Sequence, residues 1–202
     1  MKLVALCGLH GAGKDTVADA LPAQKFAFAD ALYREVADVF GVTVAYLKQR
    51  ESKELPSVRL ALDSAAGSKF DSFIRAKLRS SGESIWQTSY TILKTPRSPR
   101  QILQWWGDYR RASDPDYFIN KCRADVVEHR EVVITDCRFP NEAAMVRQLG
   151  GQIWQVVRPG HNPPRNGHAS ENDGTEFSPD VVIINNGTLE ELRATALQEW
   201  NK

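Results

Sequence analysis

Short apolar runs alternate along the chain with stretches in which apolar residues recur at helical spacing. The apolar runs predict strands at residues 3–7, 25–28, 132–135, 153–157 and 181–184. The helical stretches lie between them, at residues 14–21, 30–40, 101–106, 116–128, 141–149 and 188–200. Strands that alternate with helices favour a parallel sheet that is covered on both faces. The sequence therefore predicts an α/β fold of three layers around a central parallel sheet of about five strands.

The first predicted strand leads directly into a glycine-rich segment, Gly8-Leu9-His10-Gly11-Ala12-Gly13-Lys14-Asp15-Thr16. This segment matches the phosphate-binding loop (P-loop) pattern G-x-x-x-x-G-K, between a strand and a helix as that pattern requires. Glycines let the backbone curl so that successive N–H groups point at one anion, and the following helix adds its positive end. Lys14 can reach the β- and γ-phosphates, and the Thr16 hydroxyl can reach Mg²⁺. The hydroxyl comes one place later than usual, a spacing found in several small-molecule kinases.

Two stretches interrupt the alternation of strands and helices. Residues 43–95 are polar and compatible with helix, and a turn is expected at 95–100. Residues 159–179 are rich in Pro, Gly, Asn and His, and so long a loop usually has a function. Small phosphotransferases need one part that holds the acceptor and one that closes over the donor. We therefore expect one P-loop domain, with a core of residues 1–42 and 131–202, a mainly helical acceptor-binding insertion at about 43–130 and a lid loop at about 159–179.

A second group of polar residues follows the strand expected at 132–135. Ligands of open parallel sheets bind beyond the carboxyl ends of the strands. Asp136 could hold Mg²⁺ through water and Arg138 could reach a phosphate, the alternative being a helix cap and a surface arginine. Further arginines stand at predicted loops and element ends, where they would suit phosphoryl transfer or lie on a solvated surface: Arg100, Arg110, Arg111, Arg158 and Arg165.

Composition narrows the classes of function. The 202 residues include 26 basic and 25 acidic ones, a formal net charge of +1 that gives no global electrostatic reason to bind nucleic acid or a membrane. The three cysteines show no C-x-x-C spacing, so neither a disulfide framework nor a zinc site is expected. Cys7 and Cys137 are expected to be buried as small apolar side chains. Without a visible signal peptide or membrane span, cytoplasmic residence is the default expectation.

Taken together, the motifs resemble the phage-type deoxynucleoside monophosphate kinases, a family within the P-loop nucleoside monophosphate kinases. The resemblance runs nearly end to end and is carried by Gly8 to Thr16, residues 28–32, Arg100 to Gln104 with Gly107, residues 135–143, residues 156–160, His168 with Ser170 and Glu171, and residues 180–192. The P-loop alone is shared by very many proteins. The D-x-R-x-x-N-E block, the R-P-G strand end and the His-x-Ser-Glu loop are much more specific in combination.

The resemblance implies ATP-dependent phosphorylation of a deoxynucleoside monophosphate to the diphosphate, with Mg²⁺. The implied donor contacts are Gly8, His10, Gly11, Ala12, Gly13, Lys14, Asp15 and Thr16, and the implied metal contacts are Thr16, Asp15 and, through water, Asp136. The implied acceptor contacts are Asp30, Arg34, Arg100, Gln104, Arg111, Asp136 and Arg138. The implied catalytic residues are Lys14, Arg138 and Arg158, and the implied lid residues are His168, Ser170 and Glu171.

The sequence departs from the family pattern in two places. Members often have Pro-Leu-Lys after the second strand, where this chain has Ala31-Leu32-Tyr33 followed by Arg34, so a cationic role has moved to Arg34 or disappeared. The stretch after Gly107 is a residue shorter than usual, which leaves Arg110 open as an alternative to Arg111. Residues 43–95 match little, and there we expect the acceptor base to be selected.

Other functions stay open at this point. A P-loop kinase that resembles dephospho-coenzyme A kinase would need room for a pantetheine in residues 43–130. A nucleotide-dependent switch is disfavoured by the clustered arginines and by the lack of an N-K-x-D motif. Nucleic-acid binding is the least favoured reading, given the near-neutral charge. The sequence is compatible with a monomer or a homodimer, and a phage-encoded chain would work in the host cytoplasm.

Overall fold

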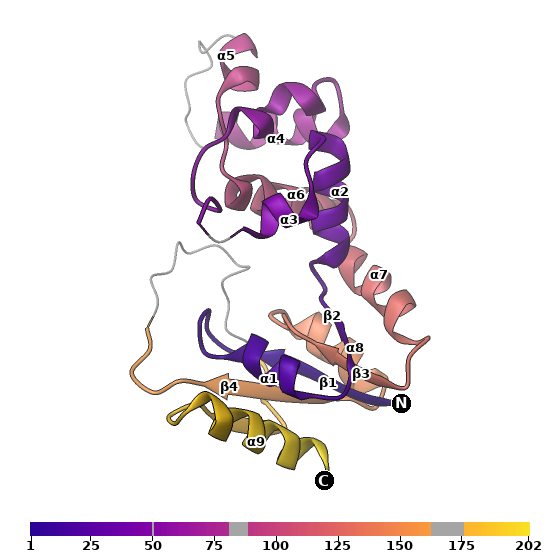
Figure 1. The fold of residues 1–202 in the computed structure, drawn as a ribbon. Coiled ribbons are helices and arrows are strands. Elements are labelled where there is room, and N and C mark those ends of the chain that lie inside the picture. Colours follow the sequence, from indigo (N-terminus) through magenta and orange to yellow (C-terminus); the bar gives the residue numbers. More distant parts are fainter. Residues whose placement is uncertain (50, 81–88, 163–175) are drawn as a thin grey trace. The chain divides into compact units, whose positions relative to one another are not determined.

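The structure is a computed structural model that describes residues 1–49, 51–80, 89–162 and 176–202. Its strands are β1 (Lys2–Cys7), β2 (Gln24–Phe26), β3 (Glu131–Ile134), β4 (Gln152–Val157) and β5 (Val181–Ile184). They form one sheet in the order β2-β3-β1-β4-β5 (Figure 1). Every pair of neighbouring strands is parallel. All five strands lie where the apolar runs placed them, and the predicted α/β fold is confirmed.

The helices of the described residues are α1 (Lys14–Ala20), α2 (Asp30–Phe40), α3 (Val44–Lys48), α4 (Lys69–Ser80), α5 (Ser89–Lys94), α6 (Pro99–Ser113), α7 (Tyr117–Val126), α8 (Pro140–Gln148) and α9 (Leu189–Trp200), with short 3₁₀ helices η1 (Val58–Leu60) and η2 (Leu62–Ala65). The predictions differ from the structure mainly at α6. That helix begins earlier and continues through Gly107, where we expected it to end.

Helix α6 owes its bounds to a cap and to packing. Ser98 is its N-cap and accepts a hydrogen bond from the Gln101 N–H at 3.2 Å, with Pro99 in the favoured first helical position. The turn expected at 95–100 therefore ends at Ser98. Gly107 is buried within the helix, so packing on both sides outweighs the roughly 1 kcal/mol that a glycine costs in a helix interior.

The sheet is covered by helices on both faces because successive residues of its strands point to opposite layers. In β1, Val4 and Leu6 pack with residues of α1 and α9. Leu3, Ala5 and Cys7 pack on the other face with residues of α7 and α8. Helices α1 and α9 therefore share one face of the sheet. This arrangement brings the loops at the carboxyl ends of β1, β3, β4 and β5 to one edge.

The chain forms two compact units. The first comprises Met1–Asp30 and Phe118–Lys202 and contains the sheet, and the second is Ala31–Tyr117. The described residues of the second unit form helices and turns around a core that includes Phe70 and Trp106, whose ring centroids lie 4.7 Å apart. Ser57 and Arg97 form an isolated antiparallel bridge in this unit. The described part of the polar stretch at 43–95 thus contains helices joined by turns.

The apolar roles expected for cysteines are confirmed. Cys7, Cys122 and Cys137 are buried, and none of the three forms a disulfide. Burial raises the pKa of the Cys122 and Cys137 thiols, so both stay protonated near neutral pH. Within the described ranges, no helix has the length and apolar character that crossing a bilayer would require.

Candidate active site

The segment between β1 and α1 has the backbone of a phosphate-binding loop. Gly8, Gly11 and Gly13 have φ values of 127°, 78° and 110°, which residues other than glycine rarely adopt. A Cβ on Gly8 would lie 2.3 Å from the Val156 carbonyl oxygen, and a Cβ on Gly13 would lie 2.7 Å from Asn185 Nδ2. Both the conformation and the close neighbours therefore require glycine, as the sequence motif implied.

Lys14 lies against its own loop. Its Nζ donates hydrogen bonds to the carbonyl oxygens of Gly8 at 2.7 Å and Leu9 at 2.9 Å. Burial, with a smaller contribution from the positive charge of Arg138, lowers the pKa of Lys14 to about 8 against the opposing effect of nearby acidic groups. The ammonium group is thus partly desolvated, and both of these hydrogen-bond partners are neutral carbonyls.

Two side chains from other loops hold the outer side of the P-loop. Asn185, after β5, donates from Nδ2 to the Ala12 carbonyl oxygen at 2.8 Å. His161, after β4, places Nε2 2.7 Å from the His10 carbonyl oxygen. In a trans peptide the N–H points away from the C=O, so these contacts direct the next two amides, those of Gly11 and Gly13, toward the other side. Neither amide donates to a backbone carbonyl of the described residues, as an anion site requires.

Asp136, directly after β3, is tied to the backbone before α2. Its two carboxylate oxygens accept hydrogen bonds from the N–H groups of Phe28 at 2.7 Å and Ala29 at 3.0 Å. Burial raises the pKa of Asp136, while Arg138 and the two N–H donors oppose that rise. Asp136 thus holds a segment of the first unit in place, and its expected contact with Mg²⁺ through water stays a prediction.

The structure brings several predicted site residues into electrostatic contact at the P-loop. The charges of Arg138, Asp15 and Asp136 all act on the pKa of Lys14. Asp30, the first residue of α2, belongs to the same unit and accepts a hydrogen bond from the Ala27 N–H at 2.9 Å. The roles of these residues toward phosphate and metal stay predictions.

Glu142 is a residue of this site that the sequence analysis did not assign. It is 3% exposed. Its Oε2 accepts hydrogen bonds from the backbone N–H groups of Arg138 at 2.7 Å and Phe139 at 3.1 Å. Glu142 thereby fixes the turn that carries Arg138 at the start of α8. The sequence contained a signal for this role of Glu142, because Pro140 followed by Glu142 is typical of the first turn of a helix.

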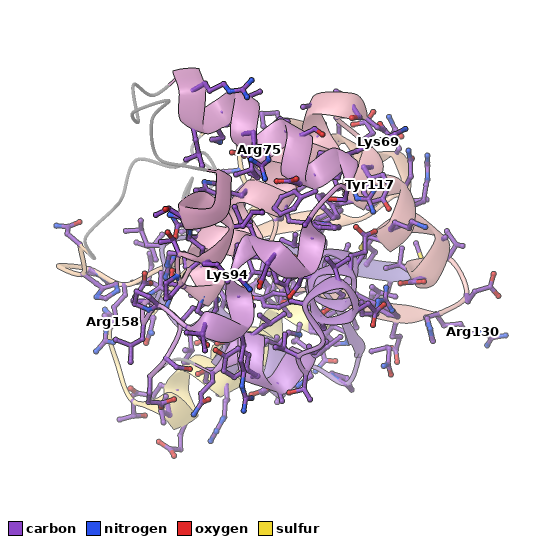
Figure 2. The ribbon with its side chains drawn as sticks, turned by 90° about the horizontal axis from the view of Figure 1, so that it is seen from above. Lys69, Arg75, Lys94, Tyr117, Arg130 and Arg158 are labelled. Atoms are coloured by element: carbon purple, nitrogen blue, oxygen red, sulfur yellow. The ribbon has the colours of Figure 1, made fainter. Side chains whose placement is uncertain are left out.

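Arg158 lies at the start of the turn after β4, and its side chain is exposed (Figure 2). The turn is closed by a hydrogen bond from the His161 N–H to the Arg158 carbonyl oxygen at 3.2 Å, with Gly160 at φ 72°. The expected lid residues His168, Ser170 and Glu171, and also Arg165, lie outside the described residues.

The second unit contains four of the predicted acceptor residues, Arg34 on α2 and Arg100, Gln104 and Arg111 on α6. The Arg100 side chain pairs with Glu54, and its backbone N–H donates to the Lys53 carbonyl oxygen at 3.0 Å. Gln104 Nε2 is buried without a hydrogen-bond partner among the described residues. Because buried amides are normally satisfied, this atom is a candidate for contact with a ligand or water.

Glu35, a carboxylate to which the sequence analysis assigned no role, binds the first of the two adjacent arginines of α6. Glu35 Oε2 accepts hydrogen bonds from Trp106 Nε1 and Arg110 Nε, both at 2.8 Å. The other oxygen of Glu35 accepts one from the Tyr117 hydroxyl. Burial alone would raise the pKa of Glu35, but the bonds from Tyr117, Trp106 and Arg110 hold it below its usual value. Arg110 also lies with its guanidinium 4.8 Å from the Tyr117 ring centroid, so it joins α2, α6 and the start of α7.

Arg111 has a different environment. A Cβ on Gly107 would lie 2.8 Å from Arg111 Nη1. A larger residue at position 107 would displace this guanidinium. The glycine that the motif places one turn earlier on α6 therefore makes room for Arg111. The contact of Arg111 with an acceptor stays a prediction.

The P-loop also fits a Mg²⁺ ion bound together with phosphates. Among the described residues, no group of three or more His, Cys, Asp or Glu side chains is placed to hold a metal ion. Mg²⁺ usually keeps several waters and is held by one or two protein groups together with substrate phosphates. Thr16 and Asp15, both in the first turn of α1, are residues of the kind that such a site uses.

Comparisons with known proteins show what part of this chain is similar to. Residues 104–196 match the family model described as Deoxynucleotide monophosphate kinase. A protein of Acanthamoeba polyphaga mimivirus, named "Putative deoxynucleotide monophosphate kinase", is 42% identical over 65 residues, which cover 32% of this chain and 33% of that protein. The similarity thus spans about a third of the relative's length. The stretch at residues 104–196 is thus similar to deoxynucleotide monophosphate kinases.

Proposed function

We propose that this chain transfers the γ-phosphoryl group of ATP to a deoxynucleoside monophosphate and releases ADP and the diphosphate, with Mg²⁺. The observation that carries the proposal is the P-loop, in which three glycines have positive φ and the contacts of His161 and Asn185 orient the amides of Gly11 and Gly13. The P-loop lies outside the residues 104–196 that match the family. The geometry and the family match are therefore independent support.

The donor phosphates would be held by Gly8, His10, Gly11, Ala12, Gly13, Lys14, Asp15 and Thr16. A phosphate is a stronger partner for an ammonium than a neutral carbonyl is. Lys14 would therefore leave the carbonyls of Gly8 and Leu9 for the donor phosphates. Thr16, with Asp15 and Asp136 through water, would hold Mg²⁺, which neutralises charge on the phosphate oxygens when bound.

Phosphoryl transfer depends mainly on positioning and on charge stabilisation. We assign Arg138 and Arg158 to the transferring group, together with Lys14. A strong general base is unnecessary, because a phosphate oxygen of the acceptor is already ionised near neutral pH. The proposed acceptor contacts are Asp30, Arg34, Arg100, Gln104, Arg111, Asp136 and Arg138, and the proposed lid contacts are His168, Ser170 and Glu171.

The proposal also assigns donor binding, acceptor binding and covering of the donor to different parts of the chain. The core at 1–42 and 131–202 would bind the donor, the insertion at about 43–130 would bind the acceptor, and the loop at about 159–179 would cover the donor. The helical character of the described residues in the second unit supports this division. A monomer and a homodimer are both compatible with it.

A coupled assay of ADP release tests the proposal. The acceptors are dAMP, dGMP, dCMP, dTMP, their ribose counterparts and dephospho-coenzyme A, each with ATP and Mg²⁺. We expect ADP release that requires one or more of the deoxynucleotides and that is lost in Lys14→Ala. Turnover with dephospho-coenzyme A alone would identify a different kinase. Slow ADP release that is indifferent to every acceptor would identify a nucleotide-dependent switch.

A further inference from the structure

His161 makes a directed contact with the P-loop across 151 positions of sequence. Its Nε2 lies 2.7 Å from the carbonyl oxygen of His10. A carbonyl oxygen only accepts hydrogen bonds, so Nε2 carries the proton and donates. His161 thereby occupies the face of the His10–Gly11 peptide that points away from the anion site.

A second contact fixes the same ring at the same place. A Cβ on Gly11 would lie 2.8 Å from His161 Nε2 and 3.3 Å from Cε1. The imidazole therefore fills the space above Gly11 that any other residue's side chain would need. The glycine at position 11 lets His161 approach, as well as permitting the positive φ of 78°.

The orientation of one peptide bond links this contact to phosphate binding. The His10 C=O and the Gly11 N–H belong to one planar trans peptide and point in opposite directions. When His161 holds the carbonyl outward, the Gly11 N–H is directed toward the site where a phosphate would lie. That N–H donates to no backbone carbonyl of the described residues.

His161 also closes the turn that carries Arg158. Its backbone N–H donates to the Arg158 carbonyl oxygen at 3.2 Å. One residue thus holds the P-loop with its side chain and the start of the loop after β4 with its backbone. The placement of Arg158 and the orientation of the Gly11 amide are therefore fixed together.

We propose that His161 is a positioning residue for the donor phosphates, because it holds the His10–Gly11 peptide with the Gly11 N–H facing them. The proposal rests on the proposed function, in which the P-loop binds the donor nucleotide. It adds a residue from the loop after β4 to the machinery that sets the affinity for phosphates.

Two substitutions separate the hydrogen bond from the packing. His161→Phe keeps a ring above Gly11 but has no N–H, whereas His161→Gln keeps an N–H donor of similar reach. His129→Phe is the matched control, because His129 belongs to the same unit and packs on Phe26 with ring centroids 5.0 Å apart. Thermal unfolding without nucleotide verifies that each variant folds.

The readout is equilibrium binding of ADP with Mg²⁺ and of inorganic tripolyphosphate, measured by calorimetry. One hydrogen bond corresponds to a roughly three- to tenfold change in affinity. We expect His161→Phe to weaken both ligands by about that factor, and His161→Gln to recover most of the loss. We expect His129→Phe to bind as the wild type does. An equal effect on the two ligands locates the loss at the phosphates.

Each contrary outcome has a separate meaning. Wild-type affinity in His161→Phe would overturn the inference and leave the proposed function intact. Equal losses in His161→Phe and His161→Gln would also overturn it, because the N–H would then contribute nothing. A wild-type protein that binds neither ADP nor tripolyphosphate would overturn the proposed function, and the inference with it.

Discussion

The Nζ of Lys14 lies 2.7 Å from the carbonyl oxygen of Gly8, the residue at which its own loop begins. The lysine is thus held at the place where the loop curls, with its charge partly desolvated. An anion that displaces the carbonyl would gain a charged partner that is already positioned. Positioning of this kind is the main source of rate in phosphoryl transfer.

Replacing this lysine tests its role in the transition state. We expect Lys14→Ala to lower kcat by about two to three orders of magnitude, as is typical when a preorganised charged or polar contact is lost. The fold should be retained. The measurements are ADP release with the best acceptor and the thermal unfolding midpoint. Lys25→Ala, which removes an exposed lysine paired with Asp19, is the control and should keep wild-type activity; an active Lys14→Ala enzyme would contradict the assignment.

The pKa of Lys14 predicts a pH dependence. Because burial lowers that pKa to about 8, the ammonium loses its proton as the pH rises through that value in the nucleotide-free protein. We therefore expect kcat/KM for ATP to fall above about pH 8. Bound phosphates favour the charged form, so kcat should fall only at higher pH. A Lys14→Arg variant stays charged over this range and should lack the fall; a flat wild-type profile up to about pH 10 would contradict the pKa.

Glu35 should stabilise the second unit. Because its hydrogen bonds hold its pKa below the usual value, the stabilisation is present above the usual pKa of a glutamate and is lost as the pH falls through the lowered one. We expect Glu35→Gln to reduce the free energy of unfolding by roughly 1.5–3 kcal/mol near neutral pH. The difference from wild type should shrink below about pH 4. Urea unfolding at several pH values measures it. The control changes Glu199, a partly buried residue that pairs with the exposed Lys202, to Gln and should cost less.

The two adjacent arginines of α6 should behave differently. Arg110→Ala removes a donor to Glu35 and should lower the thermal unfolding midpoint. Arg111→Ala should raise the KM for the acceptor, with little change in the KM for ATP. The measurements are the thermal unfolding midpoint of both variants and their KM values for the acceptor and for ATP. If the KM for the acceptor changed only in Arg110→Ala, Arg110 and not Arg111 would be the arginine that contacts the acceptor.

The sheet was predictable because its strands are short apolar runs bounded by turns, and both faces are buried. Val132 to Ile134 shows this: all three residues are fully buried, and the sequence is apolar without a break. The P-loop was predictable because its chemistry is local, within Gly8 to Thr16. At Gly107 local rules were wrong, because a glycine read as a helix end is instead packed inside α6.

The contacts that organise the site were not predictable, because they join residues that are remote in sequence. Glu35 meets Arg110 and Tyr117 across 75 and 82 positions. Asn185 meets Ala12 across 173 positions. Polar residues of this kind look like ordinary surface residues until the fold brings a backbone carbonyl or a second charge beside them.

The most direct test follows the phosphorus atoms of the reaction. Purified protein is mixed with ATP, Mg²⁺ and the four deoxynucleoside monophosphates, and the products are observed by ³¹P NMR. The account predicts that ADP and a deoxynucleoside diphosphate form in equal amounts, with wild-type protein but not with Lys14→Ala. ADP accompanied by inorganic phosphate, with every deoxynucleoside monophosphate unchanged, would contradict it.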